Sequence, residues 1–360
     1  MNIVYGVSGE GLGHVFEAIE IITLLRADGH TVKVLTFGDR ALRCLAAYRP
    51  TPIEGVHLCV DANGLSLWKT LLRNYPCFPF FLKNGRRLMK ELADFRPDVF
   101  LTAYEPFTTL ASHRLGKPLI SMDNQNELRF LSRPRGASMF AFYLVRLTNR
   151  IVTYGAAAYI VKSFHRRSVT AGHMHVVAPI IQSEIRTLQP TTGSHVLVYL
   201  TKPNPDLIGV LRTMTEQTFI VYCHNRVGED QNLIFRAQGP SYLRDLASCK
   251  AIIGTTGFSL IADAIYLKKP YYGVPLKKQF EQTNNAYFLT KSGLGEASET
   301  VTREQLERFF SRLGDYRDRL AKYNLDPAEQ EETLRSLLAE IERRTPEDTK
   351  RARLWQPEFR

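Results

Sequence analysis

The clearest structural pattern in this 360-residue chain lies at residues 251–274, which read AIIGTTGFSLIADAIYLKKPYYGV. Its first three residues are apolar and rich in β-branched side chains, and the run is too short for a helix, so it predicts a buried strand. Residues 258–267 repeat apolar side chains at helical spacing. Pro270 must follow the end of that helix, and it opens a second strand-like run at 271–274. The order strand, turn, helix, strand indicates one β-α-β unit of a parallel sheet.

The turn inside this unit, Gly254-Thr255-Thr256-Gly257, is its chemical part. Free backbone N–H groups and the positive end of the helix dipole favour a phosphate at a helix N-terminus. The hydroxyls of Thr255 and Thr256 add hydrogen-bond donors, and Gly257 lets a ligand approach the backbone closely. A purely structural tight turn has the same composition, so the turn alone does not establish a site.

Polar residues beyond the turn strengthen the hypothesis of a nucleotide site. Asp263 lies six residues after Gly257, and the pair Glu281-Gln282 begins the next predicted helix. A carboxylate suits the paired hydroxyls of a ribose, and a Glu-Gln pair suits the hydroxyls of a sugar. Taken singly, Asp263 is equally consistent with a solvated helix face, and Gln282 with an ordinary first-turn residue. Their combination with the turn favours a functional site.

These residues resemble the nucleotide-sugar site of GT-B glycosyltransferases, in particular bacterial enzymes related to the lipid-linked N-acetylglucosaminyltransferase of peptidoglycan synthesis. The resemblance implies that the turn holds the donor diphosphate, that Asp263 holds the ribose, and that Gln282 reads the sugar hydroxyls. The family acid is usually glutamate, and the aspartate found here is one methylene shorter. The donor side as a whole would comprise Thr255, Thr256, Gly257, Asp263, Glu281 and Gln282.

The start of the chain predicts a second unit of strand, loop and helix. A strand at 3–7 is followed by the loop 8–14, SGEGLGH, and by a helix that ends at Asp28-Gly29, where glycine is a natural stop. A glycine-rich loop in this place also suits a dinucleotide. The acidic residue expected at the end of the next strand, 31–36, is missing, so a nicotinamide site is disfavoured.

The GEGLGH string also resembles the N-terminal loop of the GT-B family, where the histidine faces the reaction centre. The resemblance makes His14 the leading candidate for a general base, because imidazole titrates near neutrality. The alternative is a histidine that only caps or orients the first helix. Glu105, after the strand 98–102, is the second candidate for the base, with helix capping as its alternative. The acceptor-side loops would comprise Gly11, Gly13, Asp123 and Gln125.

The composition narrows the class of protein. The formal net charge is +11, which favours an anionic partner: nucleic acid, an acidic lipid surface or a polyanionic substrate. The five cysteines are scattered and show no CxxC pair, which indicates reduced thiols in a cytoplasmic setting. The chain begins directly with a strand, so we expect no signal peptide. The most apolar window, 139–161, is interrupted by Arg146, Asn149 and Arg150, so it predicts a core helix and a strand rather than a membrane span.

Residues 64–95 interleave aromatic and basic side chains on a segment rich in predicted helix. This pattern suits the interfacial zone of an anionic membrane. It also suits single-stranded nucleic acid. A pair of amphipathic helices with buried aromatic side chains is the simplest interpretation.

Two series of alternating strands and helices predict an α/β protein with two facing doubly wound, Rossmann-like domains. The acceptor-side domain would span 1–180, a linker 181–194, the nucleotide-sugar-binding domain 195–344 and a basic tail 345–360. In GT-B relatives the last helices return to the first domain, and residues 316–323 are the candidate segment here.

The resemblance implies transfer of a sugar from a UDP-linked donor to an acceptor hydroxyl, with inversion. No Asp-x-Asp signature is present, so we expect metal-independent chemistry with the nucleotide sugar as cosubstrate and no cofactor. The acceptor is expected to be a lipid-linked or polyanionic glycan, and the protein to be cytoplasmic or peripheral on the inner face of the membrane. Two rivals remain. A nucleotide-sugar 2-epimerase needs acid and base groups around C2 that we do not identify, and a nucleic-acid-binding protein leaves the spacing of Gly257, Asp263 and Gln282 unexplained.

Overall fold

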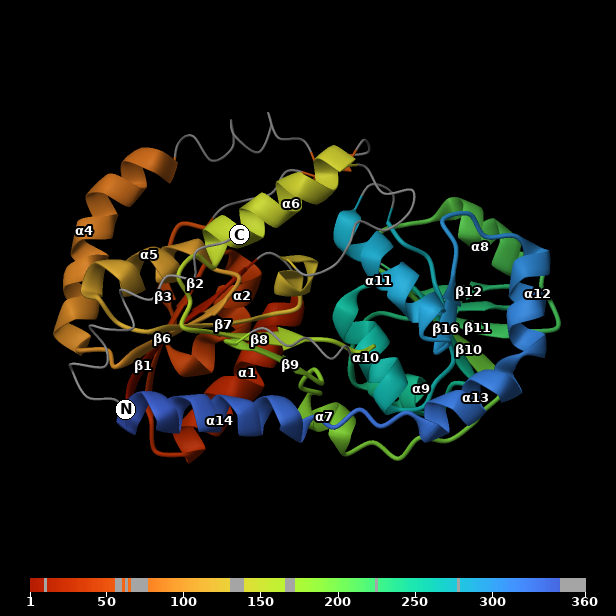
Figure 1. The fold of residues 1–360 in the computed structure, drawn as a ribbon. Helices are drawn as coiled ribbons and strands as arrows, with labels where there is room; N and C mark the ends of the chain where they lie inside the picture. The colour runs from red at the N-terminus through yellow and green to blue at the C-terminus, as the bar shows by residue number, and fades with distance from the viewer. Residues whose placement is uncertain are drawn as a thin grey trace.

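The computed structural model describes residues 1–9, 12–55, 60–61, 64–65, 77–129, 139–165, 172–223, 226–276 and 279–343. They form two α/β domains that lie side by side, each with a central sheet covered by helices (Figure 1). The elements up to the connection are β1 (Asn2–Val7), α1 (Leu12–Ala27), β2 (Thr31–Thr36), α2 (Asp39–Cys44), η1 (Ala46–Tyr48), β3 (Thr51–Pro52), β4 (Val60–Asp61), β5 (Gly64–Leu65), α4 (Cys77–Phe95), β6 (Val99–Ala103), α5 (Pro106–Leu115), β7 (Leu119–Asp123), η2 (Gln125–Arg129), α6 (Met139–Val152), β8 (Ala158–Lys162), β9 (Met174–Val177) and α7 (Ser183–Arg186). The remaining elements are β10 (His195–Leu200), α8 (Pro205–Arg212), β11 (Thr218–Cys223), β12 (Gly228–Asp230), β13 (Leu233–Phe235), α9 (Pro240–Ser248), β14 (Ala251–Gly254), α10 (Phe258–Tyr266), β15 (Tyr271–Gly273), α11 (Phe280–Lys291), β16 (Gly295–Ala297), α12 (Arg303–Ser311), α13 (Leu313–Lys322) and α14 (Ala328–Arg343).

Both sheets are doubly wound. The first has the strand order β3-β2-β1-β6-β7-β8-β9, and the second has the order β12-β13-β11-β10-β14-β15-β16. Neighbouring strands run parallel except β12 and β13. Parallel strands are buried on both faces, which is why β1, β10 and β14 consist of nearly continuous apolar residues. The predicted fold class is confirmed, and each sheet reverses its strand order beside its central strand, the point where open α/β sheets bind ligands.

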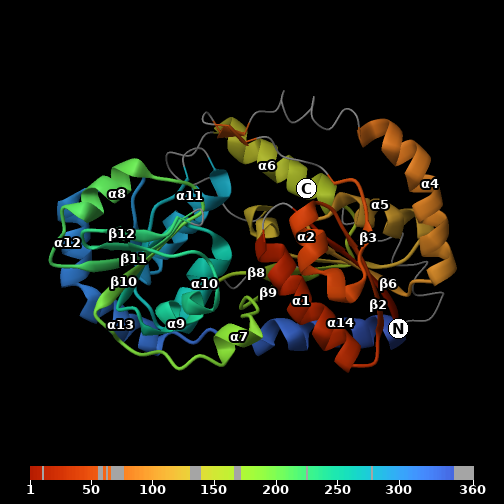
Figure 2. The same ribbon diagram turned by 180° about the vertical axis from the view of Figure 1, so that it is seen from behind.

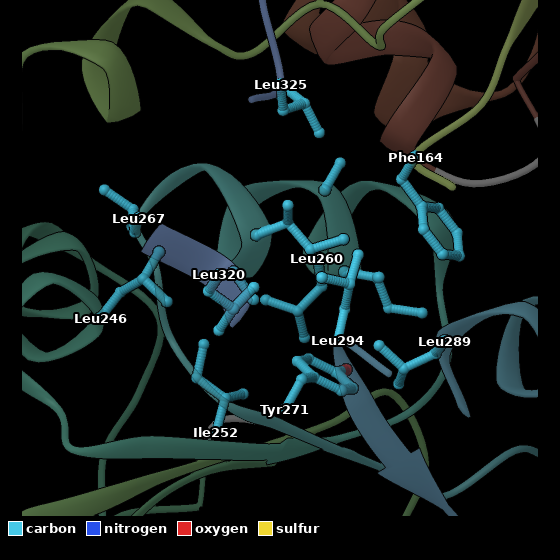
Figure 3. Packing of buried hydrophobic residues seen from close by; sticks show 14 of the residues in the cluster. Phe164, Leu246, Ile252, Leu260, Leu267, Tyr271, Leu289, Leu294, Leu320 and Leu325 are labelled. Carbon is cyan, nitrogen blue, oxygen red and sulfur yellow. The ribbon is translucent and has the colours of Figure 1, made fainter. Parts of the chain in front are cut away.

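The core of the second domain extends to residues of the first. Ile252, Leu260 and Tyr271 lie at its centre, between β14, α10 and β15 (Figure 3). Phe164, which follows β8 of the first domain, packs into the same cluster. Its ring centroid lies 5.5 Å from that of Phe258. Each large side chain buried in this way contributes roughly 1.5–3 kcal/mol, so the shared cluster stabilises the domain arrangement as well as the second domain.

The C-terminal helix returns to the first domain, as both ribbon views show (Figures 1 and 2). Leu334 and Leu338 of α14 are buried in the core that surrounds the first sheet. Residues 316–323 were the predicted returning segment, and for Tyr316 this is wrong, because its ring is buried in the second domain. Tyr323 does reach the first domain, where its hydroxyl donates a 2.5 Å hydrogen bond to the carbonyl oxygen of Phe164.

Helix α6 is buried on one face only. Phe142 is 2% exposed, whereas Tyr143, Leu147 and Ile151 are 59%, 55% and 64% exposed. The prediction of a core helix at the start of the window 139–161 is therefore wrong for the outward face. Side chains four residues apart lie on that face, and no described element covers them.

Several predictions concern residues outside the described ranges. Trp68, Tyr75, Gly11 and the tail 345–360 are among them, and so are the side chains of residues 78–82 in α4. At the end of α4, Arg87 is exposed and pairs with Glu91 at 3.2 Å. Within the described residues, no helix is both long enough and apolar enough to cross a membrane.

Candidate active site

The carboxyl ends of β1, β6, β7 and β8 meet at one edge of the first sheet, because these strands are parallel. His14 follows β1 at the start of α1, Glu105 follows β6, Asp123 ends β7 and Lys162 ends β8. The fold therefore gathers the predicted acceptor-side residues at the sheet edge that binds ligands in this architecture.

His14 lies in the first turn of α1 and is partly buried. Its Nδ1 is buried and has no hydrogen-bond partner among the described residues. Burial, together with the positive charge of Lys162, lowers the pKa of His14 to about 3. The pKa of His14 therefore lies far below the value near neutrality that a free imidazole has. With this pKa the imidazole is neutral at physiological pH.

Glu105 caps helix α5. Its carboxylate accepts hydrogen bonds from the backbone N–H of Phe107 at 2.8 Å, the N–H of Thr108 at 2.7 Å and the Thr108 hydroxyl at 2.5 Å. The side chain is fully buried, and burial raises the pKa of the carboxyl group. Gly6 of β1 packs so closely that a methyl group there would overlap the Thr108 hydroxyl. These contacts make Glu105 the N-cap of α5, which was the alternative to its role as a general base.

Asp123 and Gln125 organise the turn that follows β7. The Asp123 carboxylate accepts hydrogen bonds from the Ser121 hydroxyl at 2.8 Å and from the backbone N–H of Asn126 at 2.7 Å. It is fully buried, and burial raises its pKa. The carbonyl oxygen of Gln125 accepts a 2.7 Å hydrogen bond from the Asn149 side chain. Asp123 thus holds the turn through its carboxylate, and Gln125 holds α6 through its backbone carbonyl oxygen.

The two domains meet at the site through two contacts. The Asn124 side-chain amide donates a 3.0 Å hydrogen bond to Glu281 of α11. On α1, a methyl group built on Gly13 would lie 2.9 Å from the hydroxyl oxygen of Ser259 in α10. The first turn of α1, which carries His14, therefore lies directly beside the first turn of α10.

Lys162 is a site residue that the sequence analysis missed. It is 3% exposed and forms an ion pair with Glu17 of α1, whose other oxygen accepts a 2.7 Å hydrogen bond from Gln330 of α14. The strand 158–161 was predicted, so a lysine at its carboxyl end was the available signal. Its burial depends on α1 and α14, which no local pattern reveals.

The positive charge of Lys162 affects the pKa values of several polar groups at the site. It lowers the pKa of His14, and it opposes the rise that burial causes in the pKa values of Asp123 and Glu281. Burial of the Glu281 carboxyl group among protein atoms raises its pKa, although the residue as a whole is exposed. The site therefore contains one buried cation that could also face an anionic ligand.

The predicted phosphate turn precedes α10, and it has an open side. Gly257 is the N-cap residue, so no side chain caps the helix, and a methyl group built on it would meet no atom of the described residues within 4 Å. The Thr256 hydroxyl donates a 2.8 Å hydrogen bond to the carbonyl oxygen of Gln282, so it is engaged within the protein. Thr255 is buried, and its carbonyl oxygen accepts the Tyr271 hydroxyl at 2.6 Å. The backbone N–H groups that begin α10 are thus the available phosphate donors.

Asp263 lies in the middle of α10 and is 8% exposed. Burial raises its pKa to about 8, so its carboxyl group is mostly protonated at pH 7. Burial raises the pKa values of Tyr242 and Tyr271, and an ionised Asp263 carboxylate raises both further, so both tyrosines lie near Asp263. The alternative of a solvated helix face is excluded by this burial.

Glu281 and Gln282 form the first turn of α11. The Gln282 side-chain oxygen accepts a 2.9 Å hydrogen bond from the backbone N–H of Leu276, which supports the connection after β15. Its amide nitrogen makes no hydrogen bond to a described residue, so it is available to a ligand hydroxyl. In the part of the chain that the structure describes, no group of three or more histidine, cysteine, aspartate or glutamate side chains is arranged to hold a metal ion.

A curated sequence relative and two solved structures that are similar to this chain are named as glycosyltransferases. A curated relative from Methanosarcina mazei, named an uncharacterized glycosyltransferase, is 29% identical over 143 residues, which are 38% of this chain and 36% of the relative. The match thus spans little more than a third of that protein. Spinosyn forosaminyltransferase SpnP superposes with a TM-score of 0.64 and 17% identity, covering 95% of this chain and 99% of that one.

A second solved structure, spinosyn rhamnosyltransferase SpnG complexed with thymidine diphosphate, has a TM-score of 0.60 and 13% identity, over 94% of this chain and all of that one. At these identities the two structures establish a shared fold, and the expected GT-B architecture is confirmed. The family model described as glycosyl transferase family 1 matches residues 1–314. Because that match covers most of the chain, including residues of both domains, this protein belongs to glycosyl transferase family 1.

Proposed function

We propose that this protein transfers a sugar from a UDP-linked donor to an acceptor hydroxyl, with inversion at the anomeric carbon and without a metal ion. The supporting observation is the contact between Gly13 and Ser259, which brings the N-termini of α1 and α10 together. His14 and the turn 255–257 then face one cleft. An acceptor hydroxyl beside His14 and a diphosphate at the turn would lie on opposite sides of the reacting carbon.

In this proposal the first turn of α10 binds the diphosphate through its backbone N–H groups and the helix dipole. The bond between the anomeric carbon and the diphosphate oxygen breaks, and its electron pair leaves with the diphosphate. The acceptor oxygen attacks from the opposite face, which inverts the configuration, and His14 takes its proton. The α10 amides stabilise the charge that develops on the leaving diphosphate.

The structurally similar rhamnosyltransferase SpnG was solved with thymidine diphosphate, which supports a sugar donor that carries a pyrimidine nucleoside diphosphate. For the acceptor we retain a lipid-linked or polyanionic glycan of the cell envelope, because the chain carries a net charge of +11. Cys44, Cys223 and Cys249 are free thiols, which supports a cytoplasmic site of action. The resemblance to the peptidoglycan enzyme supports work at the inner face of the membrane.

A panel of UDP- and dTDP-sugars tests the proposed reaction. Calorimetry measures binding of each donor without an acceptor, and nucleotide release is then followed with candidate glycan acceptors. Tight binding of one donor and release of its nucleotide would support the proposal. Formation of an epimer without release would identify a 2-epimerase. Binding of nucleic acid without affinity for any nucleotide sugar would identify a binding protein instead.

Asp263→Ala is expected to weaken UDP binding roughly 10- to 100-fold. The buried carboxyl is mostly neutral at pH 7, so we assign each of two ribose hydrogen bonds an ordinary contribution of about 0.5–1.5 kcal/mol. Calorimetry with free UDP measures the loss, and Asp94→Ala, at an exposed position of α4, is the matched control. An affinity equal to that of the wild type would remove Asp263 from the donor site.

Gln282→Glu should weaken binding of the preferred UDP-sugar about tenfold and leave free UDP almost unaffected. The glutamate keeps an oxygen for the backbone N–H of Leu276 but lacks the amide donor that we assign to a sugar hydroxyl. Calorimetry with both ligands gives the ratio. Equal losses for UDP and UDP-sugar would show that Gln282 acts on the nucleotide or on the fold of the turn.

A further inference from the structure

We infer that the outward face of α6 is a docking surface for an anionic lipid bilayer. Met139, Tyr143, Leu147 and Ile151, which we call the α6 stripe, are 63%, 59%, 55% and 64% exposed. They recur every fourth residue, so they lie on one side of the helix. A helix of 14 residues is about 21 Å long, and the stripe extends over almost all of it. Contiguous exposed apolar side chains of this size mark an interaction surface.

The inward face of α6 fixes the orientation of the stripe. Asn149 is fully buried, its amide donates to the carbonyl oxygen of Gln125 at 2.7 Å, and its own oxygen accepts the Tyr104 hydroxyl at 2.7 Å. Phe142 is also buried. Rotation of the helix to hide the stripe would break both hydrogen bonds and leave buried polar groups unpaired. The stripe therefore stays exposed unless something outside the described chain covers it.

Exposed apolar side chains also occur on helix α5 and just after α6. Leu110 of α5 is 47% exposed, and Tyr154, just after α6, is 51% exposed. The two helices are held together by a 2.6 Å hydrogen bond from the Thr109 hydroxyl to the carbonyl oxygen of Val152. The His113 and Tyr154 rings also lie 5.5 Å apart. An amphipathic surface of this kind can enter the headgroup zone to a depth of about 5–10 Å.

Charge around the stripe selects an anionic partner. Residues 106–122 and 139–161, which contain α5 and α6, include no aspartate or glutamate. Arg114, Lys117 and Arg146 are exposed on them. Exposed apolar side chains beside cations, on helices that carry no acidic residue, are typical of a surface that binds an anionic membrane. A second copy of the chain fits less well, because a symmetric pairing of α6 helices would bring the same cations face to face.

The position of α6 connects this surface to the cleft. The helix runs along the first domain toward α11 in both ribbon views (Figures 1 and 2). The ring centroids of Phe142 and Phe280 lie 5.7 Å apart, and Phe280 immediately precedes Glu281. A bilayer against the stripe would thus lie beside the mouth of the cleft. If the proposed transferase function holds, an acceptor on a lipid anchor could enter without leaving the membrane.

Vesicle co-sedimentation of the full chain tests this inference. Vesicles of phosphatidylglycerol and phosphatidylcholine in equal amounts are compared with vesicles of phosphatidylcholine alone. We expect the wild type to sediment with the anionic vesicles. The triple variant Tyr143→Ser/Leu147→Ser/Ile151→Ser should lose roughly 100-fold in partitioning, because three apolar side chains no longer enter the interface. All three positions are exposed, and thermal melting verifies that the variant is folded.

A matched pair of single variants separates the stripe from general surface hydrophobicity. Ile151 and Val227 of the second domain are 64% and 68% exposed, so Ile151→Ser should weaken sedimentation and Val227→Ser should not. Equal effects of this pair, or no sedimentation of the wild type, would overturn the inference. So would a dimer in sedimentation velocity that the triple variant abolishes while no form of the protein binds vesicles. UDP affinity, measured on the same proteins, distinguishes this inference from the proposed function. Vesicle binding that depends on the stripe, without any nucleotide binding, would support the docking surface and contradict the transferase function.

Discussion

Replacement of His14 by alanine is expected to lower turnover by roughly 10²–10⁴-fold while leaving donor affinity nearly unchanged. In our proposal His14 acts on the acceptor hydroxyl only as the bond forms, whereas the donor is held by α10 and α11. The observations behind this expectation are the place of His14 in the first turn of α1 and the contact of that turn with α10. Turnover with saturating UDP-sugar and acceptor, compared with UDP affinity by calorimetry, gives the two values.

The lowered pKa of His14 makes this prediction more specific. The pH dependence of kcat/KM reports the free enzyme, in which His14 is neutral above about pH 3. We therefore expect kcat/KM to show no decline near pH 6.5 that is due to this histidine. A decline near pH 6.5 that is absent from the residual activity of His14→Gln would contradict the low pKa. A turnover loss of only a few-fold in His14→Ala would pass the role of base to another group or to the substrate.

Stability measurements guard against a trivial explanation of lost turnover. The folded pKa of His14 lies below the unfolded value of 6.5, so the unfolded chain binds the extra proton first, and wild-type stability is lost as the pH falls from about 6.5 toward 3. His14→Gln cannot take up that proton. It should therefore lose less stability than the wild type between pH 7 and pH 5, as measured by urea unfolding.

Asp263→Asn is expected to stabilise the protein at alkaline pH by about 2–4 kcal/mol. Burial raises the pKa of Asp263 from 3.8 to about 8 in the folded protein, so the folded state keeps a proton that the unfolded chain releases. Stability of the wild type therefore falls as the pH rises from about 4 to 8, by about 1.4 kcal/mol per pH unit, and reaches a cost on the order of 5 kcal/mol above pH 8. An unpaired buried amide returns part of this gain, about 1–3 kcal/mol.

The decisive measurement is how the free energy of unfolding changes with pH, because the cost of burying the amide does not depend on pH. Urea unfolding from pH 4.5 to pH 8.5 should show a difference between Asp263→Asn and the wild type that grows with pH. Asp94→Asn, at an exposed position, serves as the control and should follow the wild type. Parallel profiles for Asp263→Asn would mean that Asp263 ionises at an ordinary pH. A residue that costs this much stability is consistent with one kept for ligand binding.

Local patterns were sufficient to predict most of the fold. The strands β1, β10 and β14 are short apolar runs between turn residues, and buried parallel strands have that pattern wherever they lie in a sheet. The helix α10 was predicted at 258–267 and is found at Phe258–Tyr266, because its apolar repeat and Pro270 are both local signals. The prediction that α6 is a core helix was wrong for its outward face, because an apolar repeat predicts a helix but not how much of its surface other elements cover.

The sequence by itself determined the two parallel sheets, the turn before α10, and which polar residues end strands at the ligand-binding edge. Only the tertiary structure decided what those residues do. Gly6 and Thr108 enclose the Glu105 carboxylate and make it a helix cap. Lys162 was overlooked, yet it is buried against Glu17 and acts on His14. The physical reason is that secondary structure follows from neighbours along the chain. Burial, and with it the ionisation of a side chain, depends on elements that are distant in sequence and come together only in the folded protein.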